Sequence, residues 1–441
     1  DLHSFPTRRS SDLVGASKVI AIALRICRRT GGSLPGAIAL KISNEVLKSL
    51  TYPIKYIAVT GTNGKTGTTG IIRDIFQNAG FDVISNIHGD NLIFGITTAI
   101  LKKTSPFTKK VKADVIVLEV DELTLASKID DLFISDVVIT NLFPDQLDRY
   151  GTMDTLVKQI GSALQGFTGR VITNSDDPML YILHNVGFGI CENVFTEHRS
   201  SDTQGLNAFC PGCNGVLVYN YHQYGHVGDF YCKNCGLKRW QPKYLANIEE
   251  DGSYEVNGMK FDSSGRGLYH YYNELAAISV ALEYGIPHDI IKNTLKSIKP
   301  SKGRMERFGD VLLNLVKNPV GLNQVISYIS NENIMNDKKY KSLLFALSDA
   351  PADGMDVSWT WELNTKKLWE AGITDVICTG PRCYDAALVF KYSEYDFTVK
   401  PVESTESAAR KIMNEGGYAI STYTALTGVR NVLEKINAEV K

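Results

Sequence analysis

The feature that most constrains the fold of this chain is an apolar run that leads through a glycine-rich loop into a helical pattern. The run YIAVT (residues 56–60) is rich in β-branched residues, the loop GTNGKT (61–66) follows directly, and TTGIIRDIFQNAG (68–80) has the pattern of a helix. A buried strand that feeds a turn and then a helix is the repeating unit of parallel α/β sheets. The segment therefore predicts an α/β protein.

The same loop predicts a phosphate-binding site. The full Walker motif is G-x-x-x-x-G-K-[ST]; Gly64, Lys65 and Thr66 match its end, whereas Val59 stands at the earlier glycine position. Glycines let backbone N–H groups turn toward phosphate oxygens, and the helix N-terminus faces the same anion. A Gly/Thr-rich turn with one surface lysine is the alternative, which the strand before and the helix after disfavour. The expected ATP-binding residues here are Gly61, Thr62, Asn63, Gly64, Lys65 and Thr66, with Thr66 also on Mg²⁺.

The rest of the chain contains two further series of apolar, strand-like runs that alternate with helical segments. Short apolar runs without alternation are typical of strands buried on both faces, so helices should cover both sides of a mostly parallel sheet. A polar segment at 299–310 separates the two series, which we assign to an ATPase domain (51–305) and a C-terminal Rossmann-like α/β domain (306–441). The expected further strands are 82–85, 114–120, 136–142 and 170–174 in the first series, and 311–316, 342–348, 375–380, 397–402 and 418–423 in the second.

The N-terminal residues differ from the rest. Residues 1–13, DLHSFPTRRSSDL, resemble a translated sequencing adapter and are interpreted as a non-native scar, with a disordered natural leader as the alternative. Residues 14–50 are expected to be a helical segment. Within it, residues 14–29 form an apolar stretch with a basic end, which suits a packed helix or, alternatively, contact with a membrane surface.

The overall composition argues against a strongly charged binding protein and against a membrane-spanning protein. The 441 residues carry a formal net charge of −1, so no global field attracts nucleic acid or an anionic membrane. No apolar run reaches the ~18 residues that a membrane-spanning helix needs. Four of the eight cysteines are scattered and are expected to be buried thiols: Cys27, Cys191, Cys378 and Cys383.

The other four cysteines lie in a segment of different texture, 205–245, interpreted as an insertion. CPGC (210–213) and CKNC (232–235) are separated by 18 residues, which is a zinc-ribbon spacing. Four thiolates would close a tetrahedral structural zinc site, and two disulfides are the alternative. The expected zinc ligands are Cys210, Cys213, Cys232 and Cys235.

Several segments together resemble Mur ligases and folylpolyglutamate synthetases. TGTNGKT matches their phosphate loop, and TNLFPDQLDRYG resembles the segment after a later strand. In VLEVDEL the resemblance implies that Glu119 binds Mg²⁺. In YNELAA it implies that Asn273 contacts adenine, and in GRMER that Arg304 lies near the phosphates. These families use ATP to convert a carboxylate into an acyl phosphate, which an amine then attacks.

The chain departs from ordinary Mur ligases at three points. About 45 residues lie between the adapter-like leader and the loop, too few for a UDP-binding domain. Gln146 stands where those enzymes place a metal-binding histidine. The position of their carbamoylated lysine aligns with Ile160, although Lys158 lies close. These departures indicate that a UDP-sugar peptide is held differently or is not the substrate, and that the second metal ion is not held as in ordinary Mur ligases.

The C-terminal stretches KNPVGLNQV (317–325) and SDAPADGMDVSWTW (348–361) resemble the MurT family of lipid II isoglutaminyl synthase subunits. The resemblance implies an ATP-dependent carbon–nitrogen ligase that activates the α-carboxylate of D-isoglutamate in the lipid II stem peptide. It also implies a heterodimer with a GatD-type glutamine amidotransferase that supplies ammonia. A cytoplasmic location follows, with contact at the inner face of the membrane through the lipid-linked substrate.

The sequence itself favours a partner that provides the nucleophile. Glutaminases of this type place a catalytic cysteine in a G-x-C-x-G elbow, and no cysteine here has that context. The resemblance implies that one aspartate of the acidic turn orients the partner's catalytic histidine; we rank Asp356 first, then Asp353, then Asp349. The alternative is that these aspartates only cap the turn.

Two other functions stay open from the sequence. A stand-alone Mur- or folate-type ligase would use an amino acid as nucleophile and would need no glutamine. A nucleotide-dependent nucleic-acid-binding module would use the zinc ribbon and its basic segment KNCGLKRW, although the neutral charge balance argues against it.

Overall fold

The computed structural model describes residues 32–86, 90–105, 108–144, 152–183, 185–198, 208–263, 267–298, 303–335, 339–351 and 353–439. The proposed scar (1–13) and the apolar stretch at 14–29 lie outside these residues. The chain divides into two compact units, one made of Asp1–Ser264 and His270–Ile298, the other of Gly265–Tyr269 and Lys299–Lys441.

The first unit is built on a nine-stranded sheet with the order β11-β10-β9-β6-β5-β4-β1-β3-β2. Strands from β2 to β9 in this order are parallel, and β10 and β11 extend the edge as an antiparallel hairpin. The strands are β1 (Lys55–Thr60), β2 (Val83–Ile84), β3 (Val115–Glu119), β4 (Asp136–Ile139), β5 (Arg170–Asn174), β6 (Val186–Ile190), β9 (Tyr244–Ile248), β10 (Ser253–Val256) and β11 (Met259–Asp262).

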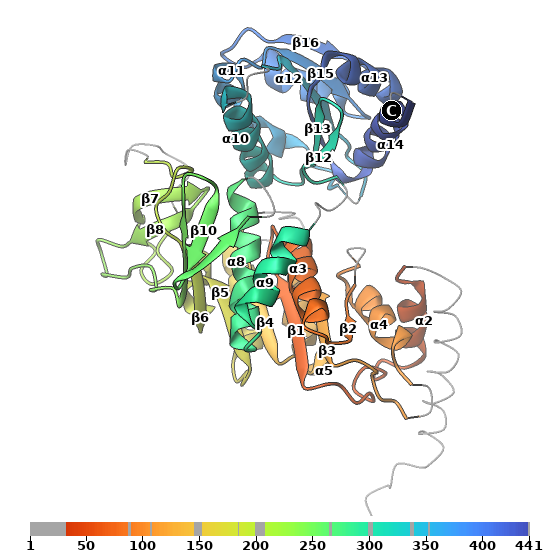
Figure 1. Cartoon of the computed structure of the whole chain (residues 1–441), viewed down its shortest axis with the longest axis vertical. Helices are drawn as coiled ribbons and strands as arrows, with labels where there is room; N and C mark the ends of the chain where they lie inside the picture. The colour runs from red at the N-terminus through yellow and green to blue at the C-terminus, as the bar shows by residue number, and fades with distance from the viewer. Residues whose placement is uncertain are drawn as a thin grey trace, which may run out of the picture. The chain divides into compact units, whose positions relative to one another are not determined.

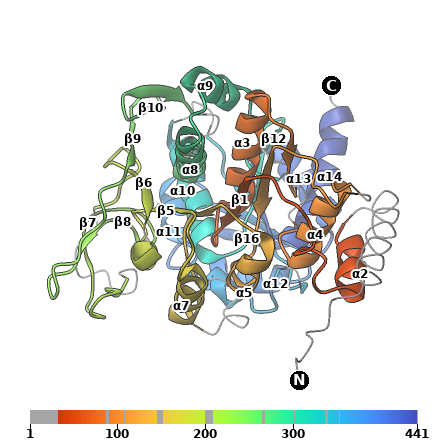
Figure 2. The ribbon, with the colours of Figure 1, turned by 90° about the horizontal axis from the view of Figure 1, so that it is seen from below.

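Helices cover both faces of this sheet. Figure 2 shows α3, α8 and α9 on one face and α5 and α7 on the other. Tyr56 and Ala58 pack into the apolar core on the second face, while Ile57 and Val59 are equally buried, so β1 is apolar on both sides, as parallel strands require. The helices are α2 (Leu34–Ile42), α3 (Lys65–Asn78), α4 (Ile93–Lys102), α5 (Glu122–Leu132), α7 (Met153–Leu164), α8 (Leu268–Glu283), α9 (His288–Ser297) and the 3₁₀ helix η1 (Pro178–Leu183).

A small antiparallel hairpin is inserted between β6 and β9. Its strands, β7 (Val218–Tyr224) and β8 (Val227–Tyr231), form a sheet of their own. Cys210 and Cys232 pack with Leu217 and Phe230 in a separate apolar cluster. We call residues 208–240 the ribbon.

The second unit has a six-stranded sheet with the order β12-β13-β17-β14-β15-β16, parallel except for β12 (Figure 1). One apolar core lies under α10, α11 and α12, and another lies under α13 and α14. The elements are β12 (Glu306–Phe308), β13 (Val311–Leu315), α10 (Pro319–Met335), β14 (Ser342–Ala346), η2 (Ser358–Glu362), α11 (Thr365–Glu370), β15 (Asp375–Thr379), α12 (Cys383–Lys391), β16 (Thr398–Pro401), α13 (Thr405–Glu415), β17 (Gly417–Ser421) and α14 (Tyr423–Glu439).

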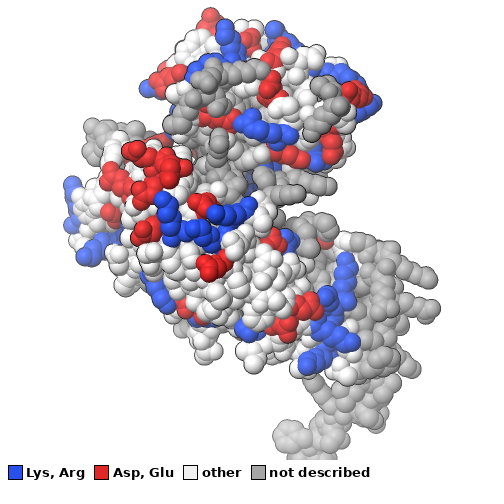
Figure 3. All heavy atoms as spheres, in the orientation of Figure 1, with Lys and Arg blue, Asp and Glu red and all other residues white. Residues whose placement is uncertain are grey.

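The predicted α/β fold class is confirmed, with differences in detail. The expected strand at 136–142 ends at Ile139, because the next residues turn toward the glycine loop. The strands β6, β9, β10, β11 and β12 were not predicted; β6 (VGFGI) carries two glycines, and β12 lies in the segment interpreted as a polar boundary. The face drawn in Figure 3 carries acidic and basic side chains on both units, with one cluster of acidic side chains on the first unit.

Candidate active site

The glycine loop lies at the carboxyl end of β1, as the sequence predicts, and α3 begins at Lys65. Gly61 and Gly64 have φ angles of 122° and 89°, which side-chain-bearing residues rarely adopt. A Cβ atom on Gly61 would lie 2.4 Å from the Thr140 hydroxyl oxygen and 2.8 Å from the Asn141 carbonyl oxygen. Glycine is therefore required at this position by both its conformation and its surroundings.

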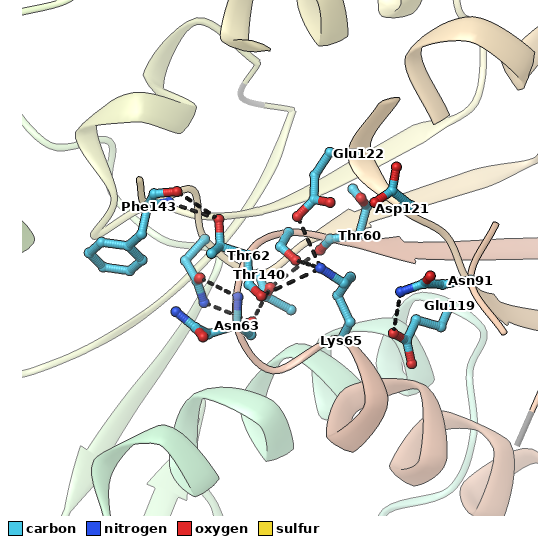
Figure 4. Close-up of polar contacts among 12 residues, drawn as sticks. Thr60, Thr62, Asn63, Lys65, Asn91, Glu119, Asp121, Glu122, Thr140 and Phe143 are labelled. Carbon is cyan, nitrogen blue, oxygen red and sulfur yellow. Dashed lines mark hydrogen bonds and ion pairs between the residues drawn. The ribbon is translucent and has the colours of Figure 1, made fainter. Parts of the chain in front are cut away.

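The loop is fixed by the segment that follows β4 (Figure 4). Asn63 donates its backbone N–H to the Asn141 side chain (2.9 Å), and the Asn141 amide donates back to the Asn63 carbonyl (3.0 Å). The Thr62 N–H bonds the Asn141 carbonyl at 2.9 Å, and the Phe143 N–H bonds the Thr62 hydroxyl at 2.9 Å. We call residues 141–143 the loop anchor, because these bonds set the shape of the loop before any ligand binds.

Lys65 points across the loop toward the end of β3 (Figure 4). Its ammonium donates to the Gly61 carbonyl and lies 3.0 Å from a carboxylate oxygen of Glu122. Burial lowers the pKa of Lys65, but the charges of Glu122 and Glu119 more than offset this, so its pKa lies above the usual range. The lysine is thus charged and held where the phosphates of a nucleotide would need a cation.

Acidic side chains gather where β3 ends and α5 begins. Glu119 is buried and accepts a hydrogen bond from the Asn91 amide at 2.9 Å, and Asp121 caps α5 by accepting from the Leu123 and Thr124 N–H groups. Glu122 is buried as well, and burial raises its pKa despite the ammonium of Lys65. Three carboxyl groups beside one lysine suit a divalent cation, for which oxygen ligands are preferred.

The oxygens of these three carboxyl groups do not all converge on one point. Within the described parts of the chain, the four cysteines are the one group of three or more candidate ligands whose atoms all lie within 4.8 Å of one another. Mg²⁺ is usually held by one or two carboxylates together with substrate phosphates, so it does not require three converging carboxylates. Thr66, expected to share in metal binding, is the second residue of α3 and is half-buried.

Asn273 extends from α8 onto the start of α3. Its side-chain oxygen accepts from the Thr68 hydroxyl at 3.4 Å. A Cβ atom on Gly64 would lie 2.3 Å from that oxygen, and one on Gly67 would lie 2.8 Å from the amide nitrogen. The glycines thus leave the space that Asn273 occupies beside the loop.

Three further residues named from the family resemblance lie within the described parts of the chain: Lys158, Ile160 and Arg304. Lys158 is exposed on α7 and Ile160 is buried, while Gln146 lies outside the described residues. Arg304 is half-buried in the second unit, just before β12.

The four predicted zinc ligands lie together. The sulfurs of Cys210 and Cys235 are 3.6 Å apart, and those of Cys213 and Cys232 are 3.4 Å apart. A tetrahedral site with Zn–S bonds of about 2.3 Å places sulfurs roughly 3.8 Å apart, whereas a disulfide needs about 2.05 Å. Backbone N–H groups of Cys235 and Asn234 help lower the pKa of Cys232 to about 6, whereas burial and the neighbouring thiols raise the pKa of Cys210. The geometry therefore fits a structural zinc site.

The three candidate aspartates of the second unit lie after β14 and have separate partners. Asp349 is 3.6 Å from Arg382, and Asp353 accepts from the Thr424 N–H, at the start of α14, at 3.0 Å. Asp356 is exposed and accepts from the Ser358 N–H at 2.8 Å; hydrogen bonds from Ser358 lower its pKa. Asp349 and Asp353 thus contact residues outside the turn, whereas Asp356 bonds within it and is the most accessible of the three.

Sequence comparisons agree with this arrangement. The Mur ligase middle domain matches residues 59–208, and the MurT ligase C-terminal domain matches residues 315–426. The Staphylococcus aureus (strain N315) protein named lipid II isoglutaminyl synthase (glutamine-hydrolyzing) subunit MurT is 31% identical over 96% of both chains.

The chain belongs to the MurT family. A Streptococcus pneumoniae protein of the same name is 32% identical over 91% of this chain and 92% of its own length. In structure, a pseudomurein peptide ligase type C from Methanothermus fervidus superposes with a TM-score of 0.69 over 89% of this chain and 81% of its own, at 21% identity, which shows a shared fold. The prediction of a Mur-type ligase is therefore confirmed. No described helix of this MurT-family chain has the length and apolar character needed to cross a membrane.

Four residues of the site were not predicted from the sequence. Glu122 and Asp121 were not singled out, although the run EVDE at a strand end carried the signal. Asn141 and Phe143 lie in the segment TNLFPDQLDRYG, but their role was not predicted. No local pattern indicates that they bind a loop about 80 residues earlier in the chain.

Proposed function

We propose that this chain is the synthetase subunit of a lipid II isoglutaminyl synthase. It activates the α-carboxylate of D-isoglutamate in the lipid II stem peptide, and a GatD-type glutaminase supplies ammonia. The names of the two relatives support this assignment. The single observation that carries it is the phosphate loop, whose Lys65 faces the acidic end of β3.

The reaction has two steps. A carboxylate oxygen of the substrate attacks the γ-phosphorus of ATP, the bond to the bridging oxygen breaks, and ADP leaves with an acyl phosphate formed. Ammonia then attacks the carbonyl carbon, inorganic phosphate leaves, and the nitrogen loses a proton to give the amide. Lys65 offsets charge on the transferred phosphoryl group, and the backbone N–H groups of the loop hold the β-phosphate.

Residues that would hold Mg²⁺ are available on both sides of the loop. Thr66 and Glu119 would hold the ion, with Glu122 as a further candidate once Lys65 turns to the phosphates. The ion supplies charge neutralisation on the phosphoryl oxygens. Asn273 is proposed to contact the adenine side of the nucleotide, and Arg304 the phosphates or ribose.

Zinc is proposed as a structural ion in the ribbon. Cys210 and Cys232 are buried in the small apolar cluster, whereas Cys213 and Cys235 are exposed. The ion would therefore connect the exposed end of each CxxC turn to that cluster. Metal analysis of the purified chain should give one zinc per chain, and Cys232→Ser should lose it. Cys191→Ser, which changes a thiol outside the group, should retain it.

The partner is proposed to meet the turn that holds Asp356. This carboxylate is exposed and bonded only within its own turn in the contacts described above, so it could accept a hydrogen bond from a histidine of another chain. The complex would act at the inner face of the membrane, where a lipid-linked substrate is reached.

The deciding experiment combines the chain with a candidate GatD-type glutaminase. The complex should amidate lipid II with glutamine and consume ATP. The isolated chain should amidate with ammonium but not with glutamine. Amide formation from glutamine by the isolated chain would support the stand-alone ligase instead, and absence of ATP binding would overturn both.

A further inference from the structure

We propose that the ribbon positions the phosphate loop, and that His226 is the positioning residue that connects them. This inference rests on the proposed function in one respect, since the loop is taken as the nucleotide site. It concerns the turn between β7 and β8, residues 224–227, which we call the ribbon turn.

The ribbon turn packs directly on the loop anchor. The rings of His226 and Phe143 have centroids 4.3 Å apart, and the ring of Tyr224 lies 5.7 Å from that of Phe143. A Cβ atom on Gly225, whose φ is 52°, would lie 2.8 Å from a ring carbon of Phe143. Phe143 is fully buried and bonds Thr62 of the loop through its backbone, so its position affects the loop directly.

A second connection runs through Asp177. The His226 imidazole bonds this buried carboxylate at 3.1 Å, and the other carboxylate oxygen accepts the Leu142 N–H at 2.8 Å. Leu142 lies in the loop anchor between Asn141 and Phe143, the two residues that bond the loop. Both the ring and the imidazole nitrogen of His226 therefore act on the same three-residue segment.

The ribbon is held in place independently of His226. Arg239 pairs with the buried carboxylate of Asp176 at 2.6 Å, and Tyr272 donates to the same carboxylate at 2.6 Å. The Gly228 N–H also bonds the Asp176 carbonyl at 2.9 Å. Loss of the His226 side chain should therefore leave the ribbon attached and its zinc site intact, while the loop anchor loses its outer support.

The experiment measures nucleotide binding and loop protection in the full chain. In His226→Ala, the dissociation constant for a magnesium complex of a non-hydrolysable ATP analogue should rise about fivefold, the scale of one hydrogen bond. Amide hydrogen exchange in peptides that cover 59–66 and 141–143 should speed up without nucleotide. In the holoenzyme the KM for ATP should rise, while kcat at saturating ATP and the KM for glutamine stay unchanged.

Three further variants keep the test specific. His226→Gln retains a donor for Asp177 and should recover part of the affinity. Gly225→Ala should weaken binding, because the added methyl group displaces Phe143. Asn220→Ala removes the exposed bond to Asp229 in the same hairpin and should bind as wild type does.

The outcomes separate the two proposals. Equal affinity and equal exchange in wild type, His226→Ala and Gly225→Ala would overturn the positioning role alone. A wild-type chain that binds no nucleotide would overturn the proposed function and the inference with it. Should His226→Ala lose zinc or unfold, His226→Gln and Gly225→Ala decide by the same measurements.

Discussion

The two units are both α/β domains with mostly parallel sheets, but they differ in how deeply the charged residues of their polar loops are buried. In the first unit, the loop after β1 is held by hydrogen bonds from the loop anchor, and the carboxylates facing it are about 4% exposed. In the second unit, the turn after β14 places Asp356 at the surface beside Met355, which is 78% exposed.

The difference indicates which unit holds the buried charged groups of the ATP site. Buried charges held in fixed geometry are the arrangement that stabilises developing charge in a reaction. An exposed carboxylate beside exposed apolar side chains is instead suited to contact with another protein, where such residues become buried. We infer that the first unit carries the ATP chemistry and that the second recognises the partner.

The strongest test of this division is Lys65→Ala. Removal of the ammonium leaves the phosphoryl charge and three nearby carboxyl groups without their cation. Amidation should fall about a thousandfold or more, with either glutamine or ammonium as nitrogen source. Activity of the complex checks this, and Lys128→Ala, which removes a half-exposed ion pair with Asp131, is the matched control. Retained activity would remove the loop from the mechanism.

Asp356→Asn tests whether the second unit recognises the partner. If its carboxylate orients a histidine of the partner, glutamine-dependent amidation should fall on the order of a hundredfold or more. Amidation with free ammonium should not change, because the ATP site is untouched. Asp353→Asn and Asp349→Asn should have smaller effects on this ratio. An unchanged ratio in Asp356→Asn would leave the aspartate as a turn cap only.

The sequence predicts the elements whose signals are local. β1, the glycine loop and α3 are adjacent in the chain, so their apolar pattern and glycines suffice to place Lys65 and Thr66. The four cysteines are predicted for the same reason, since zinc knuckles have fixed spacing. The second sheet also follows from its apolar runs.

What the sequence does not show depends on long-range contacts. Thr62 and Phe143 are 81 residues apart, and His226 and Asp177 are 49 apart, so no local pattern reveals their bonds. Glu122 looks like an ordinary first-turn acid of α5 until Lys65 is placed 3.0 Å away. The strand β12 was not predicted either, because two of its three residues are charged and give no apolar run.

Asn141→Ala tests whether hydrogen bonds from the loop anchor set the shape of the glycine loop before a nucleotide binds. The change removes two hydrogen bonds to Asn63 and should raise the dissociation constant for the ATP analogue about tenfold. Titration calorimetry measures this. Asn364→Ala deletes a comparable amide in the second unit, where it caps α11 by accepting from the Lys367 N–H. That variant should lose about 1 kcal/mol of stability with unchanged nucleotide affinity; weaker binding in both would indicate a general loss of stability.

The smallest expected effect concerns the surface of the second unit. Met355→Ser removes an apolar side chain next to Asp356 and should weaken binding of the glutaminase about fivefold, as measured by surface plasmon resonance. The stability of the isolated chain should change by less than about 0.5 kcal/mol, because the side chain is exposed in the absence of a partner. Ile54→Ser alters an apolar residue of the first unit that is 94% exposed and should leave partner binding unchanged. Equal binding by both variants would mean that exposure near Asp356 does not mark the interface, and that the partner contacts another face.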